Sequence, residues 1–123
     1  MSILVPPPEQ AIVVTRGDRF EMVFGLMDRP EVVKNPAQYR FRLIFRRRQS
    51  DASPDLFVLN GDLELEPGDS VRGVDIDAMV TITATPDQTQ QLPAAGCFYF
   101  VEQTNAVGGD NVRLFQGPVE IGD

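Results

Sequence analysis

The chain has 123 residues, and its 18 acidic and 11 basic side chains give a formal net charge of −7. This length predicts one ordinary domain with enough apolar content to bury a core, and this charge disfavours nucleic-acid phosphate as a partner unless a local basic patch overrides it. Histidine is absent and Cys97 is the single cysteine, which excludes an internal disulfide and leaves a catalytic thiol without its usual base.

The first ten residues, MSILVPPPEQ, lack the basic region and the long apolar run of a signal peptide. Three consecutive prolines favour an extended, polyproline-type arm over residues 1–10, which leads into a sandwich domain over residues 11–123. An arm that is already extended loses little entropy on docking, so we expect either that it lies along a neighbouring protein or that it frays. Its candidate interface residues are Ile3, Leu4, Val5, Pro6, Pro7 and Pro8.

Two stretches alternate between apolar and polar side chains with the period of a β-strand. The first is RFEMVFGLM, whose apolar face is expected to hold Phe20, Met22, Phe24 and Leu26. The second is YRFRLIFRRR, residues 39–48, with Tyr39, Phe41, Leu43 and Phe45 on one face and Arg40, Arg42, Ile44 and Arg46 on the other. One buried and one solvated side is typical of an antiparallel sheet.

The stretch DLFVLNGDLELE contains Asn60-Gly61, the strongest short hairpin signal. A two-residue turn at this point would place alternate apolar residues of the two flanking segments opposite one another. We therefore predict a hairpin whose apolar face consists of Leu56, Val58, Leu63 and Leu65.

The remaining segments also have strand character. AMVTITAT is expected to bury Val80, Ile82 and Ala84. TPDQTQQLP has the pattern of a capping box followed by one short helical turn that Pro93 ends. CFYFVEQT, where Cys97 is expected to be a small buried hydrophobe, and VRLFQGPVEI form two strands joined by NAVGGDN. Pro118 predicts that part of the last strand lies at an edge or forms a bulge.

Seven or eight short strands, with turn signals at close intervals and no helix of core length, predict an all-β sandwich or barrel in one domain. No apolar run approaches the ~20 residues of a membrane-spanning helix, so we expect no membrane contact. We also expect no cofactor and no metal. The acidic stretch DLELEPGDSVRGVDID lacks the ligand pattern of a calcium loop, and no nucleophile elbow or phosphate-binding glycine loop is present.

The arginines of the segment 39–48 permit three interpretations. A ladder of Arg40, Arg42 and Arg46 could bind phosphate, although that face lacks aromatic residues for base stacking. The same side chains could pair with carboxylates on neighbouring strands, for which Glu64, Glu66, Asp75, Asp77 and Glu102 are available. They could also meet an acidic surface of a protein partner, where arginine is favoured over lysine. We favour a solvated sheet face or a protein interface over a nucleic-acid site.

The tripeptide Arg16-Gly17-Asp18 invites comparison with adhesive ligands. A Gly-Asp pair entering a strand is, however, an ordinary turn. We therefore predict a turn here and no adhesive function.

The last third of the chain resembles a recurrent bacteriophage virion domain. In that family an alternating strand leads to a T…LPAG turn, an aromatic strand follows, and the chain closes with R-L-x-x-G-x-V. The matching residues are Thr89, Leu92, Pro93, Gly96, Phe98, Phe100, Arg113, Leu114, Gly117 and Val119. The segments RGDRFEMVFGL and YRFRLIFRRR resemble earlier strands of the family, so the resemblance covers most of residues 11–121.

Such domains are similar to the immunoglobulin-like N-terminal module of upper-baseplate proteins and to head decoration proteins. The resemblance implies an antiparallel immunoglobulin-like sandwich that docks on other virion proteins and has no enzymatic site. In the baseplate version a long fibre or receptor-binding segment usually follows, whereas this chain ends at Asp123. That difference favours a decoration, cement or adaptor protein, made in the host cytoplasm and located in the virion, with other virion proteins or its own copies as partners. A free binding module that recognises a host or phage protein is the alternative, and an enzyme of unknown type is the third.

Overall fold

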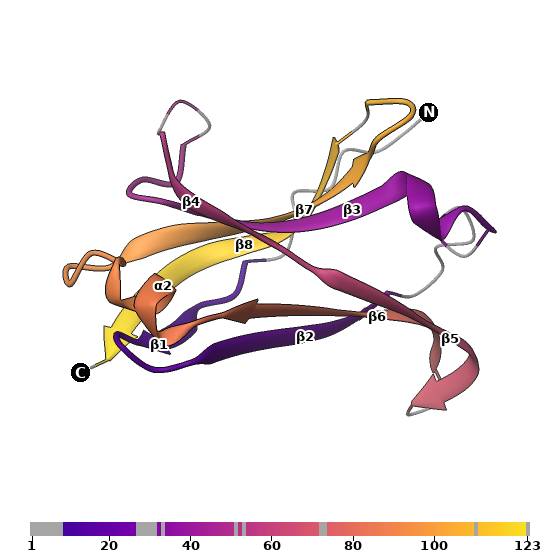
Figure 1. The fold of residues 1–123 in the computed structure, drawn as a ribbon, viewed down its shortest axis with the longest axis horizontal. Coiled ribbons are helices and arrows are strands. Elements are labelled where there is room, and N and C mark those ends of the chain that lie inside the picture. Colours follow the sequence, from indigo (N-terminus) through magenta and orange to yellow (C-terminus); the bar gives the residue numbers. More distant parts are fainter. Residues whose placement is uncertain are drawn as a thin grey trace.

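The protein forms two packed layers of β-strands (Figure 1). The structure is a computed structural model that describes residues 9–26, 32, 34–50, 52, 54–71, 74–109 and 111–122, with the backbone alone for 66–71 and 74–77. The strands are β1 (Ile12–Thr15), β2 (Phe20–Leu26), β3 (Tyr39–Arg46), β4 (Asp55–Asn60), β5 (Asp62–Val71), β6 (Val74–Ala84), β7 (Cys97–Asn105) and β8 (Asn111–Gly122). The helical elements are the 3-10 turn η1 (Pro36–Gln38) and the short helix α2 (Pro86–Gln90). The all-β prediction is confirmed.

One layer is a five-stranded sheet in the order β1-β8-β7-β3-β4, and the other is a three-stranded sheet in the order β2-β6-β5. All pairings are antiparallel except that of β1 with β8. If β4 is lettered C′, chain order makes β2-β6-β5 strands B-E-D of an immunoglobulin domain and β8-β7-β3 strands G-F-C. The strand order is therefore immunoglobulin-like, with the first strand on the G side.

The core lies between the two sheets and is filled by the faces that alternation predicted. On β3, Phe41, Leu43 and Phe45 are almost fully buried, and they meet Val80 and Ile82 of β6 in one apolar cluster. Met22 and Leu26 of β2 join the same cluster, while their neighbours Phe20 and Phe24 pack against its border. Each fully buried large apolar side chain contributes about 1.5–3 kcal/mol, so this cluster is the main stabilising element of the fold.

The predicted hairpin at Asn60-Gly61 is wrong. β4 pairs with β3 and β5 pairs with β6, so the chain crosses between the sheets at Gly61, as the continuous diagonal path of β4 and β5 shows (Figure 1). The amide of Gly61 donates to the carbonyl oxygen of Phe41 at 2.8 Å. An added Cβ at Gly61 would lie 2.8 Å from Cγ1 of Val80 and 3.0 Å from Cγ1 of Ile82. Glycine is needed there for space, and not for the positive φ of a hairpin turn.

The prediction that Pro118 marks an edge or a bulge is confirmed in part, because β1 lies beside β8 only from Val119 to Gly122. β8 lies inside the five-stranded sheet, and Pro118 stands in register opposite Phe98 of β7. On its other side the pairing is interrupted, because Gln10 donates to the carbonyl of Gln116 and β1 resumes only at Ile12, opposite Val119. A missing amide hydrogen is tolerated at such an interruption.

Helix α2 has the predicted capping box. The hydroxyl of Thr85 accepts a hydrogen bond from the amide of Gln88, whose side chain accepts one from the amide of Thr85. These two bonds satisfy backbone donors that the start of a helix leaves free, so they fix where α2 begins. The helix ends at Gln90, before Pro93, as predicted.

The Arg16-Gly17-Asp18 segment is the predicted turn, and it is held against α2. The hydroxyl of Thr89, a buried residue, accepts from the amide of Gly17 at 3.1 Å and donates to the carbonyl of Asp18 at 2.7 Å. The guanidinium of Arg16 donates to the carbonyl oxygen of Gln90 at 3.1 Å. The side chain of Arg16 and the backbone of Gly17 and Asp18 therefore form hydrogen bonds within the fold.

The predicted arm residues Ile3, Leu4, Val5, Pro6, Pro7 and Pro8 lie outside the described residues. Glu9 and Gln10, which follow them, lie against β8. The carbonyl oxygen of Gln10 accepts a 2.6 Å hydrogen bond from the hydroxyl of Tyr99, whose pKa is raised by burial. A Cβ at Gly117 would overlap the same carbonyl, so a glycine permits this close approach.

Candidate protein-docking surface

The arginines of β3 lie on the side of the five-stranded sheet that faces away from the core. We call this side the outer face. Register places Arg40 opposite Thr104, Arg42 opposite Glu102, and Arg46 opposite Phe98. On β3 and β7 the outer face therefore consists of Arg40, Arg42, Ile44, Arg46, Phe98, Phe100, Glu102 and Thr104. The prediction that Arg40, Arg42 and Arg46 share one face is confirmed.

The centre of the outer face is not solvated, which corrects the expectation of a wet sheet face. Ile44 is 2% exposed and Phe100 is 1% exposed, although neither belongs to the core between the sheets. The guanidinium carbon of Arg113 lies 4.3 Å from the centroid of the Phe100 ring, and that of Arg46 lies 5.1 Å from it. Both cations are close enough to the aromatic ring for attractive cation–π contact, and their aliphatic stems cover apolar surface.

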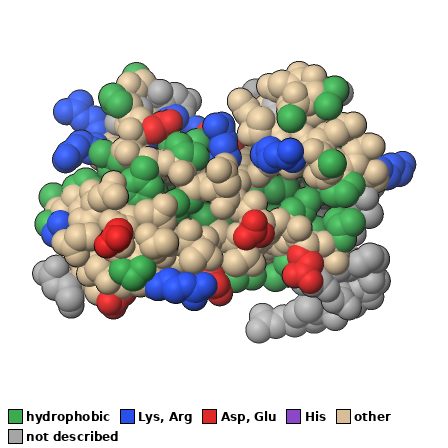
Figure 2. All heavy atoms as spheres, viewed as in Figure 1, with side chains coloured by type: hydrophobic (Ala, Val, Ile, Leu, Met, Phe, Trp, Pro, Cys, Tyr) green, Lys and Arg blue, Asp and Glu red, His purple; other side chains and the backbone are tan. Residues whose placement is uncertain are grey.

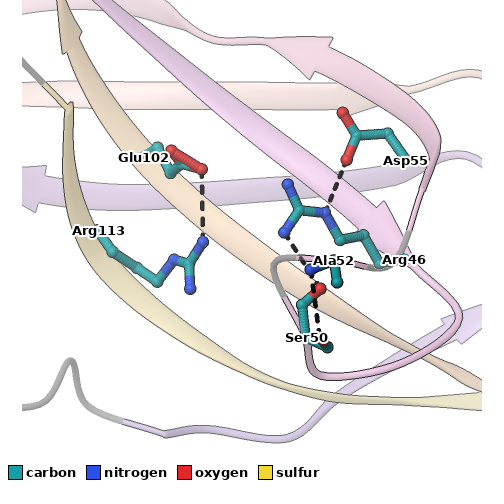
Figure 3. A network of polar contacts seen from close by, with 6 residues as sticks. All are labelled: Arg46, Ser50, Ala52, Asp55, Glu102 and Arg113. Atoms are coloured by element: carbon teal, nitrogen blue, oxygen red, sulfur yellow. Dashed lines mark hydrogen bonds and ion pairs between the residues drawn. The ribbon is translucent and has the colours of Figure 1, made fainter.

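Ion pairs hold these two stacked arginines in place (Figure 3). Nε of Arg46 lies 2.7 Å from Oδ1 of Asp55 on β4, and its Nη1 donates to the carbonyl of Ser50. Nη2 of Arg113 lies 3.6 Å from Oε1 of Glu102, which is itself 8% exposed. Arg46 and Arg113 are therefore parts of the folded framework.

The carboxylates predicted as partners were mostly the wrong ones. Glu64, Glu66, Asp75 and Asp77 belong to β5 and β6 of the other sheet. Glu102 is on the outer face, but it pairs with Arg113, outside the segment 39–48. Asp55, the partner of Arg46, was missed, since it could be found only by pairing β3 with β4 across the intervening loop.

A depression of about 640 Å³ occupies the outer face at the end of β3 nearer η1. We call it the arginine depression, and its lining consists of Arg40, Arg42, Asn60, Thr104, Gly109 and Asn111. Lys and Arg side chains gather on the upper side of the molecule in Figure 2, where the surface is hollowed between two projecting loops, and most visible acidic side chains lie lower. Among the described residues, the lining contains two guanidinium groups, two amides and one hydroxyl, and no carboxylate.

The two arginines of this depression are held differently from Arg46 and Arg113. Nη1 of Arg40 donates to the carbonyls of Ala37 and Tyr39 at 2.8 and 3.0 Å, which anchors its guanidinium at the start of β3. Nε of Arg42 and the hydroxyl oxygen of Thr104 are covered, and neither has a hydrogen-bond partner in the part of the chain that the structure describes. A buried polar atom without a partner is costly, so the hydrogen-bonding capacity of both residues is incompletely used by the described part of the fold.

The described residues do not assemble a catalytic centre around Cys97. Its thiol is buried, as predicted, and burial raises its pKa to about 11, against which the charge of Arg47 acts only partly. At neutral pH it is therefore a thiol, the unreactive form. Among the described side chains no group of three or more Cys, Asp or Glu could hold a metal ion.

No helix in the described ranges is long and apolar enough to cross a membrane. Comparison with family models found none that matches the chain, and none of the curated proteins compared with it matches significantly.

Proposed function

We propose that the protein is a non-enzymatic structural module that docks on other proteins through the outer face of its five-stranded sheet. The observation that carries this proposal is the arginine depression, a concave site whose described lining has two arginines and no carboxylate, on a chain of net charge −7. Arginine is enriched at protein interfaces, and concave sites with convergent donors recognise partners. The rest of the outer face is held by its own ion pairs and stacking contacts, so it presents this depression on a rigid support.

We further propose the virion as the place of this docking, as a capsid decoration or cement protein or as a tail, baseplate or neck adaptor. This part rests on the resemblance of residues 11–121 to phage virion domains. A two-sheet sandwich whose described residues include no metal-ligating group suits a structural protein.

Sedimentation of the purified protein with phage capsids and tails that lack it tests the proposal. Co-sedimentation at a saturating, many-copy ratio with heads is the result expected of a decoration protein, and a few copies with tails is that expected of an adaptor. Binding to neither would contradict the virion role and favour a free module.

Two charge-matched double variants test which surface docks. Arg40→Glu with Arg42→Glu should weaken co-sedimentation at least tenfold, since carboxylates replace both guanidinium groups of the depression. Arg47→Glu with Arg48→Glu changes the net charge equally, but at the exposed turn beyond the other end of β3, and should leave binding within about twofold. Equal loss in both variants would mean that net charge, and not the depression, governs docking. Arg46 is left unchanged because its reversal would disrupt the Asp55 ion pair and the Phe100 contact.

A further inference from the structure

We propose that the arginine depression binds an extended acidic peptide segment whose carboxylates are two residues apart. This inference names the chemistry of the partner and rests on the proposed protein-docking function. The depression draws its donors from neighbouring strands, with Asn60 on β4, Arg40 and Arg42 on β3, Thr104 on β7 and Asn111 on β8.

The spacing of the two arginines fixes the spacing of the ligand. Arg40 and Arg42 are alternate residues of one strand, so their Cα atoms are about 6.6 Å apart along it. An extended peptide repeats its same-face side chains at the same interval of about 6.6 Å. Carboxylates at alternate positions can therefore face Arg40 and Arg42 together, whereas adjacent carboxylates point to opposite sides.

The hydrogen-bonding groups of the depression match carboxylate oxygens. Register forms one cross-strand row of Arg40, Thr104 and Asn111, and a second row in which Arg42 stands between Asn60 and Glu102. Both rows thus place a neutral polar side chain beside a guanidinium, and a guanidinium fork fits a carboxylate in bidentate geometry. Glu102, the described carboxylate opposite Arg42, is already paired with Arg113. The ion pairs among the described residues do not include Arg42, so a ligand carboxylate would give its guanidinium a charged partner.

A protein segment fits this site better than a nucleic acid. None of the described lining residues is aromatic, and the neighbouring Phe100 is covered, so these residues offer bases no stacking platform. The net charge of −7 opposes a run of phosphates more strongly than it opposes a segment with two carboxylates.

The test is a titration of the intact protein with the pentapeptide Ser-Glu-Ser-Glu-Ser at low ionic strength, followed by amide chemical shifts. Three probes accompany it: Ser-Glu-Glu-Ser-Ser, Ser-Gln-Ser-Gln-Ser and a ten-nucleotide thymidine strand. We expect shifts centred on Arg40, Arg42 and Thr104. We also expect at least fivefold weaker binding when the glutamates are adjacent and at least tenfold weaker binding when they are glutamines. Tighter binding of the thymidine strand, no saturable binding of the first peptide, or shifts centred elsewhere would overturn the proposal.

Variants locate the site. Arg40→Gln with Arg42→Gln should weaken binding at least tenfold, and Arg47→Gln with Arg48→Gln less than twofold at the same net charge. Equal weakening in both would overturn the site. If the double variant fails to fold, the single variant Arg40→Gln replaces it, because Arg40 is exposed. This single variant should weaken binding at least threefold.

The two proposals fail in different ways. Loss of peptide binding with co-sedimentation intact would overturn this site and leave the docking function standing. Peptide binding at the depression without virion association would support the site and overturn the virion role.

Discussion

Phe100 lies on the outer face of its sheet and is nevertheless buried. Arg113 stacks closely on the ring and Arg46 approaches it from a neighbouring strand, while Glu102 and Asp55 neutralise the two cations. Arginines at alternate positions of one strand thus take different roles, because their cross-strand neighbours differ. Arg46 meets an aromatic ring and forms an ion pair with Asp55. Arg40 stands beside Thr104, and Arg42 stands between Asn60 and Glu102, whose carboxylate pairs with Arg113.

Gly61 gives a prediction at the residue scale. Changing Gly61→Ala should lower the free energy of unfolding by about 1–3 kcal/mol, because the new methyl group would press on Val80 and Ile82 in a packed core. Asn60→Ala is the matched control and should change it by less than about 0.5 kcal/mol, since Asn60 is exposed. Urea denaturation measures both. In a two-residue hairpin turn, Asn60 and Gly61 would both need positive φ, a conformation that alanine tolerates poorly. A loss of about 1 kcal/mol or more in Asn60→Ala would therefore indicate a hairpin and contradict the crossover.

At the scale of elements, the five-residue helix α2 is too short to be stable by itself. Its structural role is to connect distant parts of the chain. Its capping box fixes its start, and Thr89 in its single turn bonds to the backbone of the β1–β2 turn more than 70 residues earlier. The helix therefore ties the connection between the two sheets at one end of the molecule.

Thr89→Val tests that role. Valine keeps the shape of the side chain but leaves the amide of Gly17 and the carbonyl of Asp18 without their partner, so we expect a loss of about 1–3 kcal/mol of stability. Gln90→Ala, in the same turn, keeps the backbone carbonyl that binds Arg16 and should lose less than about 0.5 kcal/mol. Thermal and urea unfolding compare the two. Equal losses would mean that the hydroxyl of Thr89 does not hold the turn.

At the scale of the whole molecule, the two sheets share one core. Side chains from β1, β2, β3, β4, β6, β7 and β8 belong to a single apolar cluster, so neither sheet has a separate interior of its own. A fold with one core should unfold cooperatively.

Two single-tryptophan variants test this, since the chain has no natural tryptophan. Phe24→Trp reports on β2 of the three-stranded sheet, and Phe57→Trp reports on β4 of the five-stranded sheet; both positions are half-buried. In each variant the fluorescence transition in urea should coincide with that of far-UV circular dichroism. Different midpoints for the two probes within one variant would show that the sheets unfold separately.

Much of the local structure followed from the sequence. Period-two alternation predicted the inner faces of β2, β3 and β6, and the Thr85–Gln88 pattern predicted the start of α2. These signals are local, because a side chain's direction along a strand and a cap's hydrogen bonds depend on residues a few positions away.

Tertiary structure decided which strands became neighbours. Alternation gives a strand its buried face but not its partner, so the sequence could not tell that the chain changes sheets at Gly61 or that β8 is an inner strand. The same limit applies to the candidate site. The sequence placed Arg40, Arg42 and Arg46 on one face. Only the pairing of β3 with β4 and β7 brought Asp55 and Phe100 to Arg46, and left Arg40 and Arg42 beside Thr104 and Asn60, because contacts across strands join residues far apart in the chain.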